Sequence, residues 1–187
     1  MEVAEKYDLA YQSNGYASAE ASIGLKLVPW VLSNLKFTSV LDVGCGSGHS
    51  LLRFNQFGKP CTGTEISKTL LDGRLKSMVE LGIVRHAYAQ ALPFPDNSFG
   101  LTFCTEVLEH IEEPYVHKTL SGLLRVAKKY VFVTIDFQKA QCFPELELHE
   151  TVKPKGWWEA EIKRFRVRLR EVPTEREDGA CYVIQKV

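Results

Sequence analysis

Several features that would identify the class of a protein directly from its sequence are missing here. No apolar run approaches the roughly 20 residues that a membrane-spanning helix needs. The first six residues, MEVAEK, are polar and lack the apolar stretch of a signal peptide. Lysine plus arginine number 23, as do aspartate plus glutamate, so bulk charge favours neither nucleic acid nor a membrane. We therefore expect no membrane partner, and nucleic-acid binding only through a local basic patch.

Cysteines are few, odd in number and never closely paired. The five are Cys45, Cys61, Cys104, Cys142 and Cys181. Without a CxxC pair we expect neither a disulfide framework nor a zinc site, and the sequence assigns no metal ligands. Unpaired thiols suit a reducing compartment, so we expect a cytoplasmic protein.

The order of apolar segments predicts strands that alternate with helices. Strands are expected at 38–43, 61–66, 83–89, 99–105 and 129–135. Helices are expected at 23–35, with a kink or break at Pro29, and at 47–57, 67–81, 106–126 and 154–162. This alternation predicts an α/β fold with a doubly wound parallel sheet. Residues 165–172 and 180–187 alternate apolar with polar residues and predict a C-terminal antiparallel hairpin.

A glycine-rich turn follows the first predicted strand. Residues 40–43 read as a buried strand, and Gly44, Gly46 and Gly48 follow at intervals of two. Glycines allow strained backbone angles and let a ligand lie directly on the chain. The helix after such a turn presents its unpaired N–H groups at the same place. The segment therefore predicts a site for a nucleotide-like ligand.

Two carboxylates narrow the choice of ligand. Asp42 stands two residues before Gly44, where it would repel a pyrophosphate and suit a cationic amino group. The glycine spacing also differs from the GxGxxG that dinucleotide enzymes share. Glu65, which ends the second predicted strand, can accept both hydroxyls of a ribose, or can be a solvated charge at the start of a helix. Together these residues predict a site for an amino-acid-bearing nucleoside.

These motifs resemble class I S-adenosylmethionine-dependent methyltransferases over most of residues 40–135. VLDVGCGSG at 40–48 is similar to the first motif of the family, and GTEIS at 63–67 to its ribose-binding motif. ALPFPDNSFGLTF at 91–103 and EVLEHI at 106–111 are similar to the methyltransferase domain 11-like branch, which includes many small-molecule enzymes. The resemblance implies a Rossmann-like seven-stranded sheet in the order 3-2-1-4-5-7-6, closed by the terminal hairpin.

The resemblance also implies a cofactor, S-adenosyl-L-methionine, and the residues that bind it. The implied set is Asp42, Gly44, Cys45, Gly46, Glu65, Ile66, Ala89, Gln90 and Thr105. Within it the glycines would hold the methionine part, Glu65 the ribose and Ile66 one face of the adenine. Tyr88 stands where the family commonly has an aspartate that accepts from the adenine amino group. Either Gln90 or a backbone carbonyl replaces that contact, or adenine binding is weaker than usual.

The chain is most simply one domain of 187 residues in three parts. We expect a helical or lid segment at 1–36, a cofactor-binding core at 37–136, and a substrate-side loop with the terminal hairpin at 137–187. In the first part, Tyr11 and Tyr16 can close over the cofactor or pack within an N-terminal helix.

Candidate catalytic residues are His110, His149 and Glu106. Methyl transfer from a sulfonium depends mainly on orientation and exclusion of water, so the family has no universal catalytic residue. A base is required only when the acceptor arrives protonated. His110 has a structural alternative as a helix contact.

The acceptor is the least determined part of the prediction. Only the short segment 137–152 is left after the fifth strand to build a substrate pocket. This predicts a shallow pocket for an oxygen or nitrogen of a small-molecule or glycan-like substrate, or a pocket completed by a second subunit in a homodimer. One alternative is an RNA methyltransferase that uses the basic strand 164–170, although nearby glutamates favour an internally paired face. The other is a catalytically degenerate, cofactor-binding regulatory subunit.

Overall fold

The computed structural model describes residues 3–12, 22–139, 147–174 and 176–187. Its strands are β1 (Val40–Val43), β2 (Cys61–Glu65), β3 (Val84–His86), β4 (Phe99–Thr105), β5 (Ala127–Asp136), β6 (Val167–Val172) and β7 (Gly179–Lys186). Its helices are α1 (Val3–Gln12), α2 (Ile23–Asn34), α3 (His49–Gln56), α4 (Lys68–Asp72), α5 (Lys76–Glu80), α6 (Glu113–Val126) and α7 (Lys155–Lys163). Two short 3-10 turns are η1 (Ala89–Ala91) and η2 (Leu108–His110).

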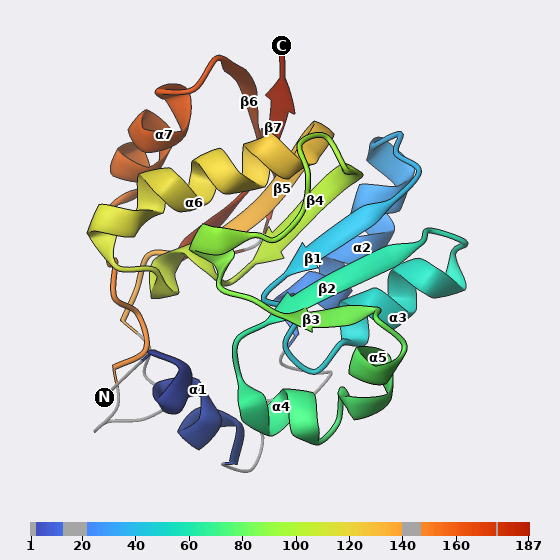
Figure 1. The fold of residues 1–187 in the computed structure, drawn as a ribbon. Coiled ribbons are helices and arrows are strands. Elements are labelled where there is room, and N and C mark those ends of the chain that lie inside the picture. Colours follow the sequence, from blue (N-terminus) through green and yellow to red (C-terminus); the bar gives the residue numbers. More distant parts are fainter. Residues whose placement is uncertain (1–2, 13–21, 140–146, 175) are drawn as a thin grey trace.

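One twisted sheet organises these elements, with helices on both of its faces (Figure 1). The strand order is β3-β2-β1-β4-β5-β7-β6, which confirms the predicted seven-stranded α/β sheet. The first five strands pair in parallel, whereas β7 lies antiparallel to both β5 and β6. The chain thus reverses its direction of winding between β1 and β4, and this is the point at which open α/β sheets bind ligands.

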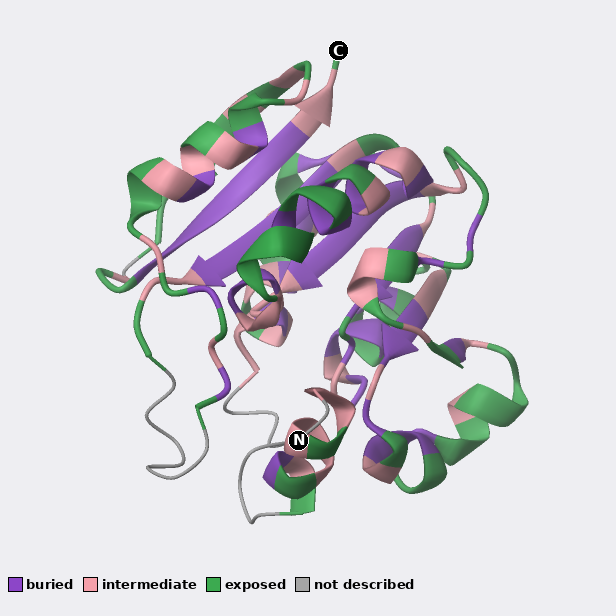
Figure 2. Ribbon diagram, turned by 60° about the vertical axis from the view of Figure 1, so that its left-hand side comes forward, coloured by how far each residue is buried: buried purple, intermediate pink, exposed green. Residues whose placement is uncertain are grey.

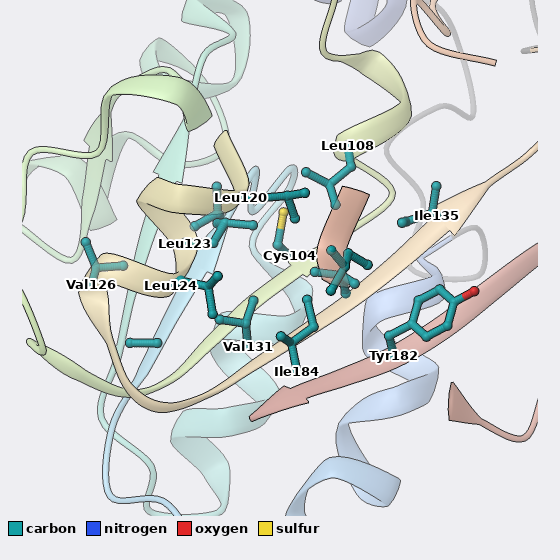
Figure 3. Close-up of a cluster of buried hydrophobic side chains, with 14 of the residues drawn as sticks. Cys104, Leu108, Leu120, Leu123, Leu124, Val126, Val131, Ile135, Tyr182 and Ile184 are labelled. Carbon is teal, nitrogen blue, oxygen red and sulfur yellow. The ribbon is translucent and has the colours of Figure 1, made fainter. Parts of the chain in front are cut away.

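Buried apolar residues pack against both faces of the sheet. On one face α6 and α7 bury Leu120, Leu123 and Trp158 against β4, β5 and β7, as the close-up in Figure 3 shows for the α6 residues. On the other face α2 and α3 bury Val28 and Phe54. The central strands are accordingly buried while the outer sides of α6 and α7 face solvent (Figure 2). Within the described ranges, no helix is long and apolar enough to cross a membrane.

The helix predicted at 23–35 forms as α2 and runs without a break through Pro29. A proline inside a helix removes one backbone hydrogen bond and crowds the preceding turn. Val28 and Val31, on either side of it, are fully buried in the core. Their packing outweighs the local cost of Pro29, so the break is wrong, while the kink expected as its alternative stays a prediction. Ser22 caps the helix, since its side chain accepts from the Leu25 N–H.

The single helix predicted at 67–81 is two short helices, α4 and α5, divided at Gly73. Gly73 has φ −101° and ψ −107°, outside the helical region. Leu70, Leu71 and Leu75 nevertheless enter one buried cluster. Two short helices therefore satisfy the apolar spacing that predicted one. Ser67 is the N-cap of α4, because its hydroxyl accepts from the Leu70 N–H.

Among the described cysteines, four are free thiols, and Cys142 lies outside the described residues. The predicted hairpin forms from β6 and β7, and Gly179 begins β7. The β4 strand forms at the residues expected for it. The helix predicted at 106–126 begins only at Glu113, as α6, because the short η2 turn occupies the residues after β4. The other strands and helices differ from their predicted bounds by a few residues.

Candidate active site

A cavity lies at the carboxyl ends of β1, β2 and β4, where the strand order reverses. Its lining comes from α1, the glycine turn after β1, the ends of β2 and β3, and residues 106–115. It contains about 750 Å³ of space, part of it open to solvent. The part that can hold the centres of water molecules is about 110 Å³.

The turn between β1 and α3 has a backbone that requires glycine. Gly44, Gly46 and Gly48 have φ values of 69°, 51° and 80°, which L side chains rarely adopt. A Cβ at Gly44 would also lie 2.6 Å from Cγ2 of Val107, which packs over the turn. Gly44 lines the cavity, so the backbone itself forms part of the ligand-binding surface.

Asp42 carries a buried carboxylate directly behind this turn. The residue is 2% exposed, and its Oδ2 atom has no hydrogen-bond partner among the residues that the structure describes. Burial, together with the charge of Glu65, raises the pKa of Asp42 to about 8. A buried carboxyl group without a partner is costly unless a ligand supplies a positive charge or a donor. Asp42 therefore fits the cationic amino group that the sequence predicted for this end of the ligand.

Glu65 ends β2 and lines the cavity with its carboxylate held in place by backbone donors. Its Oε1 accepts the N–H groups of Ile66 and Ser67 at 2.8 and 2.9 Å. Its Oε2 accepts the N–H of Gly46 at 2.9 Å. Burial outweighs these three bonds and raises the pKa of Glu65. A carboxylate has about four acceptor positions, so Oε2 retains room for a hydroxyl donor from a ribose.

The opposite end of the cavity is formed by the segment after β3. Ile66, Ala89 and Gln90 line it, as the resemblance implied for an adenine. Tyr88 lies in the same lining and is 38% exposed. Tyr88, which stands where the family commonly has an aspartate, is thus on the cavity wall together with Gln90.

Four of the nine implied cofactor residues lie outside the lining of the cavity. Asp42 and Cys45 are buried behind the glycine turn, and Gly46 binds Glu65 through its N–H group. The hydroxyl of Thr105 points towards α2, where it would lie 2.6 Å from a Cβ at Gly24. In this structure, Thr105 therefore supports the packing of α2 rather than the cavity surface.

Helix α1 covers one side of the cavity. Tyr7 and Tyr11 both line it, and their spacing of four residues puts them on the same face of the helix. Asp8 ties α1 to α4, because its Oδ1 accepts from Oγ of Ser67 at 2.6 Å and from the N–H of Thr69 at 2.9 Å. Figure 1 shows α1 beside α4 at the carboxyl ends of the strands.

Of the two tyrosines proposed from the sequence as a lid, Tyr11 is therefore on the cavity, and Tyr16 lies outside the described residues. Tyr7 was not singled out, although its spacing from Tyr11 was a usable signal.

Glu106, a candidate catalytic residue, forms an ion pair with Arg176 from the β6–β7 connection. It follows β4 with φ 53°, a left-handed conformation unusual for glutamate. Its Oε1 accepts from Thr134 Oγ1 at 2.7 Å and from Nη1 of Arg176 at 2.8 Å. Arg176 also donates from Nη2 to Asp136 Oδ2 at 2.9 Å. Glu106 lines the cavity, but its carboxylate shares Arg176 with Asp136.

The two candidate histidines lie against one another. The ring centroids of His110 and His149 are 4.6 Å apart, with an interplanar angle of 83°. The Nδ1 atom of His110 is 2.9 Å from the carbonyl oxygen of Leu148. Burial and the neighbouring His149 lower the pKa of His110 to about 3, so its ring is neutral near pH 7. His110 lines the cavity, whereas His149 stands behind it.

A seven-stranded sheet with this order, in which only β7 runs antiparallel, and a glycine turn backed by two buried carboxylates form the architecture of class I methyltransferases. A family model described as methyltransferase domain matches residues 41–135, about half of the chain. The chain therefore belongs to the methyltransferase domain family, which confirms the resemblance to S-adenosylmethionine-dependent methyltransferases and the cofactor that it implied.

Relatives and solved structures agree with this assignment. An uncharacterized methyltransferase, YcgJ of Bacillus subtilis, is 31% identical over 94 residues, 48% of this chain and 36% of the relative. The ubiquinone/menaquinone biosynthesis C-methyltransferase UbiE of Rickettsia bellii is 30% identical over 154 residues, 74% of this chain and 59% of the relative. The chain thus spans less than two thirds of either relative.

Among solved structures, the magnesium protoporphyrin IX methyltransferase of Synechocystis, with bound S-adenosylmethionine, is similar with a TM-score of 0.69. It is 14% identical, and the match covers 100% of this chain and 98% of that one. At that identity the likeness establishes the fold.

Proposed function

We propose that this protein transfers the methyl group of S-adenosylmethionine to an oxygen or nitrogen of a small-molecule or glycan-like acceptor. One observation carries the proposal. The unpartnered carboxylate of Asp42, the glycine turn and the backbone-held carboxylate of Glu65 all converge at the strand-order reversal. An amino acid joined to a nucleoside has the cationic amine, the narrow backbone contact and the ribose diol that such a surface complements.

In this proposal the residues of the chain bind, orient and exclude water. The cofactor supplies an electrophilic methyl group on a sulfonium. Asp42 favours the cationic amine of the amino acid part from behind the glycine turn, and Glu65 accepts from the ribose through Oε2. Tyr7 and Tyr11 close the cavity from α1, which keeps water from the reacting atoms.

The acceptor side of the cavity supports a small organic substrate. Val107, Ile111 and Tyr115 give it an apolar and aromatic wall. His110 and the carboxylates of Glu106 and Glu112 add a few polar groups. A mostly apolar lining with a few polar groups is typical of small-molecule sites. The Rickettsia relative is named for methylation at carbon, so the names of the relatives do not decide which atom of the acceptor receives the methyl group.

The basic strand that suggested RNA lies far from this cavity. In the strand order, β6 is four positions from β1, which corresponds to roughly 19 Å across the sheet. Arg164 pairs with Glu161 at 3.0 Å, and Arg170 lies over the ring of Trp30 at 5.4 Å. We therefore do not extend the proposal to RNA.

Calorimetric titration with S-adenosylmethionine and with its demethylated product tests the proposal. Both should bind, and Glu65→Ala should weaken binding by about 1–3 kcal/mol, or roughly 5- to 150-fold, as expected for lost hydrogen bonds to a charged group. Glu80→Ala, on the exposed side of α5, is the matched control and should bind as the wild type does. No binding of either compound at millimolar concentration refutes the enzyme, and unchanged binding by Glu65→Ala refutes the ribose assignment.

A further inference from the structure

Three side chains with ligand-type atoms converge at the wall of the cavity. Glu109, His110 and His149 each place one such atom within 4.8 Å of the other two. Two of them come from η2 after β4, and His149 comes from the segment that precedes α7. His110 belongs both to this cluster and to the lining of the cavity.

Both histidines contact a backbone carbonyl through Nδ1. The Nδ1 of His110 lies 2.9 Å from the Leu148 carbonyl, and Nδ1 of His149 bonds to the carbonyl of Gln138. A carbonyl oxygen can only accept, so Nδ1 carries the proton in each ring and Nε2 keeps its lone pair. Metal-binding histidines characteristically have their second nitrogen fixed in this way.

Glu109 supplies a buried carboxylate with an unused oxygen. The residue is 0% exposed, and its Oε1 accepts from the N–H of Asp136 at 3.0 Å. Its Oε2 has no hydrogen-bond partner. The carboxylates of Glu106 and Asp136 lie close enough to raise the pKa of Glu109 further, beyond the effect of burial. Arg176 pairs with those two neighbours, whereas no described residue donates a hydrogen bond to Oε2 of Glu109.

The backbone holds the two segments of the cluster together. The N–H of Thr151 donates to the carbonyl of Glu109 at 2.9 Å, and Thr151 Oγ1 donates to the carbonyl of Ile111 at 2.6 Å. With the bond from His110 to Leu148, these contacts fix residues 148–151 against η2. The cluster is therefore positioned by main-chain hydrogen bonds on both sides.

We propose that Glu109, His110 and His149 bind a divalent first-row transition-metal ion, through one carboxylate oxygen and the two Nε2 atoms. Two histidines and a carboxylate leave coordination positions open, which is the donor set of catalytic zinc sites and of non-haem iron sites. Because His110 also lines the cavity, an open position is available to an oxygen of the acceptor. This use of the ion rests on the proposed methyl transfer, whereas binding of the ion itself does not.

Binding of an ion requires the three ligand atoms to move slightly closer together. Ligand atoms about 2.1 Å from a tetrahedral metal lie roughly 3.4 Å from one another. The three atoms, now within 4.8 Å, therefore have to approach by about 1–1.5 Å, which side-chain rotation in the half-buried His149 can provide.

Calorimetric titration of the untagged full chain, freed of metal with a chelator, tests the site directly. Zinc chloride and manganese chloride are titrated separately, and the visible absorption of bound cobalt reports nitrogen coordination. We expect one ion per chain, with at least tenfold weaker binding in His149→Ala and in Glu109→Gln. His117→Ala is the matched control, because this exposed histidine pairs with Glu161 outside the cluster. The control should bind the ion as the wild type does.

Titration of the demethylated cofactor into each variant, together with circular dichroism, shows whether the fold and cofactor site remain intact. Absence of ion binding by the wild type overturns the metal site, as does equal binding by wild type and His149→Ala. Failure of the wild type to bind the cofactor overturns the proposed function and leaves the ion titration as an independent result.

Discussion

Replacement of Asp42 with asparagine is expected to change how the stability of the protein depends on pH. Burial and Glu65 raise the pKa of this carboxyl group from 3.8 to about 8 in the folded chain. Between these two values the folded state keeps a proton that the unfolded state has released. The contribution of Asp42 to stability is therefore fully present below about pH 4 and is lost as the pH rises to about 8.

The size of the effect follows from the difference in bound protons. One proton corresponds to a slope of about 1.4 kcal/mol per pH unit inside the window, so raising the pH from 5 to 8 should cost about 3–4 kcal/mol. Asparagine does not titrate, and any fixed cost of its buried amide is the same at every pH. The difference in stability between the wild type and Asp42→Asn should therefore change by that amount across the range.

Urea unfolding of both proteins at several pH values between 5 and 8 measures this difference. Asp96→Asn is the matched control, since the side chain of Asp96 is 71% exposed and its difference from the wild type should stay nearly constant. Saturating S-adenosylmethionine should shrink the pH dependence, because a cationic group beside Asp42 favours the ionised carboxylate. A flat difference for Asp42→Asn would refute the inference that this carboxylate is buried without a partner.

Two further substitutions test the turn and the helix that close the cavity. Gly44→Ala should destabilise the protein by about 1–2 kcal/mol for its left-handed backbone and about 1–3 kcal/mol more for the clash with Val107, measured by urea unfolding. Gly58→Ala is the control, because Gly58 also has a positive φ but no atom lies within 4 Å of the new Cβ. Equal losses of stability in the two variants would contradict the close packing at Gly44. Asp8→Ala removes the bonds from Ser67 and Thr69 that hold α1, and should speed cofactor dissociation by roughly tenfold, as for about 1.4 kcal/mol of lost contact. An unchanged dissociation rate in stopped-flow measurements contradicts a closing role for α1.

The cofactor side of the site could be predicted from the sequence because its determinants are local. The glycine turn follows directly from β1, and Glu65 ends the next strand in the chain. Parallel pairing of β1 with β2 then brings Asp42 and Glu65 to the same edge of the sheet. The alternation of strands and helices is enough to predict this parallel arrangement, and no side-chain contact has to be known.

The acceptor side could not be predicted in the same way, because its contacts join distant segments. Arg176 is 70 residues from Glu106 in the chain, and nothing around it marks a partner for that carboxylate. His149 is 39 residues after His110 and reaches it only through the bonds that fix residues 148–151 to η2. The sequence named both histidines as separate candidates and assigned no metal ligands, since the unused oxygen of Glu109 is visible only in the fold.

These long-range contacts connect the choice of acceptor to the proposed metal site. Arg176 engages the carboxylates of Glu106 and Asp136, and the low pKa of His110 makes its ring a weak base. An acceptor hydroxyl therefore finds little help in losing its proton from these three groups. A divalent ion beside His110 would lower the pKa of a bound hydroxyl, which removes the need for a strong base. An oxygen acceptor would thus gain from the ion, whereas an acceptor that arrives unprotonated needs neither the ion nor a base.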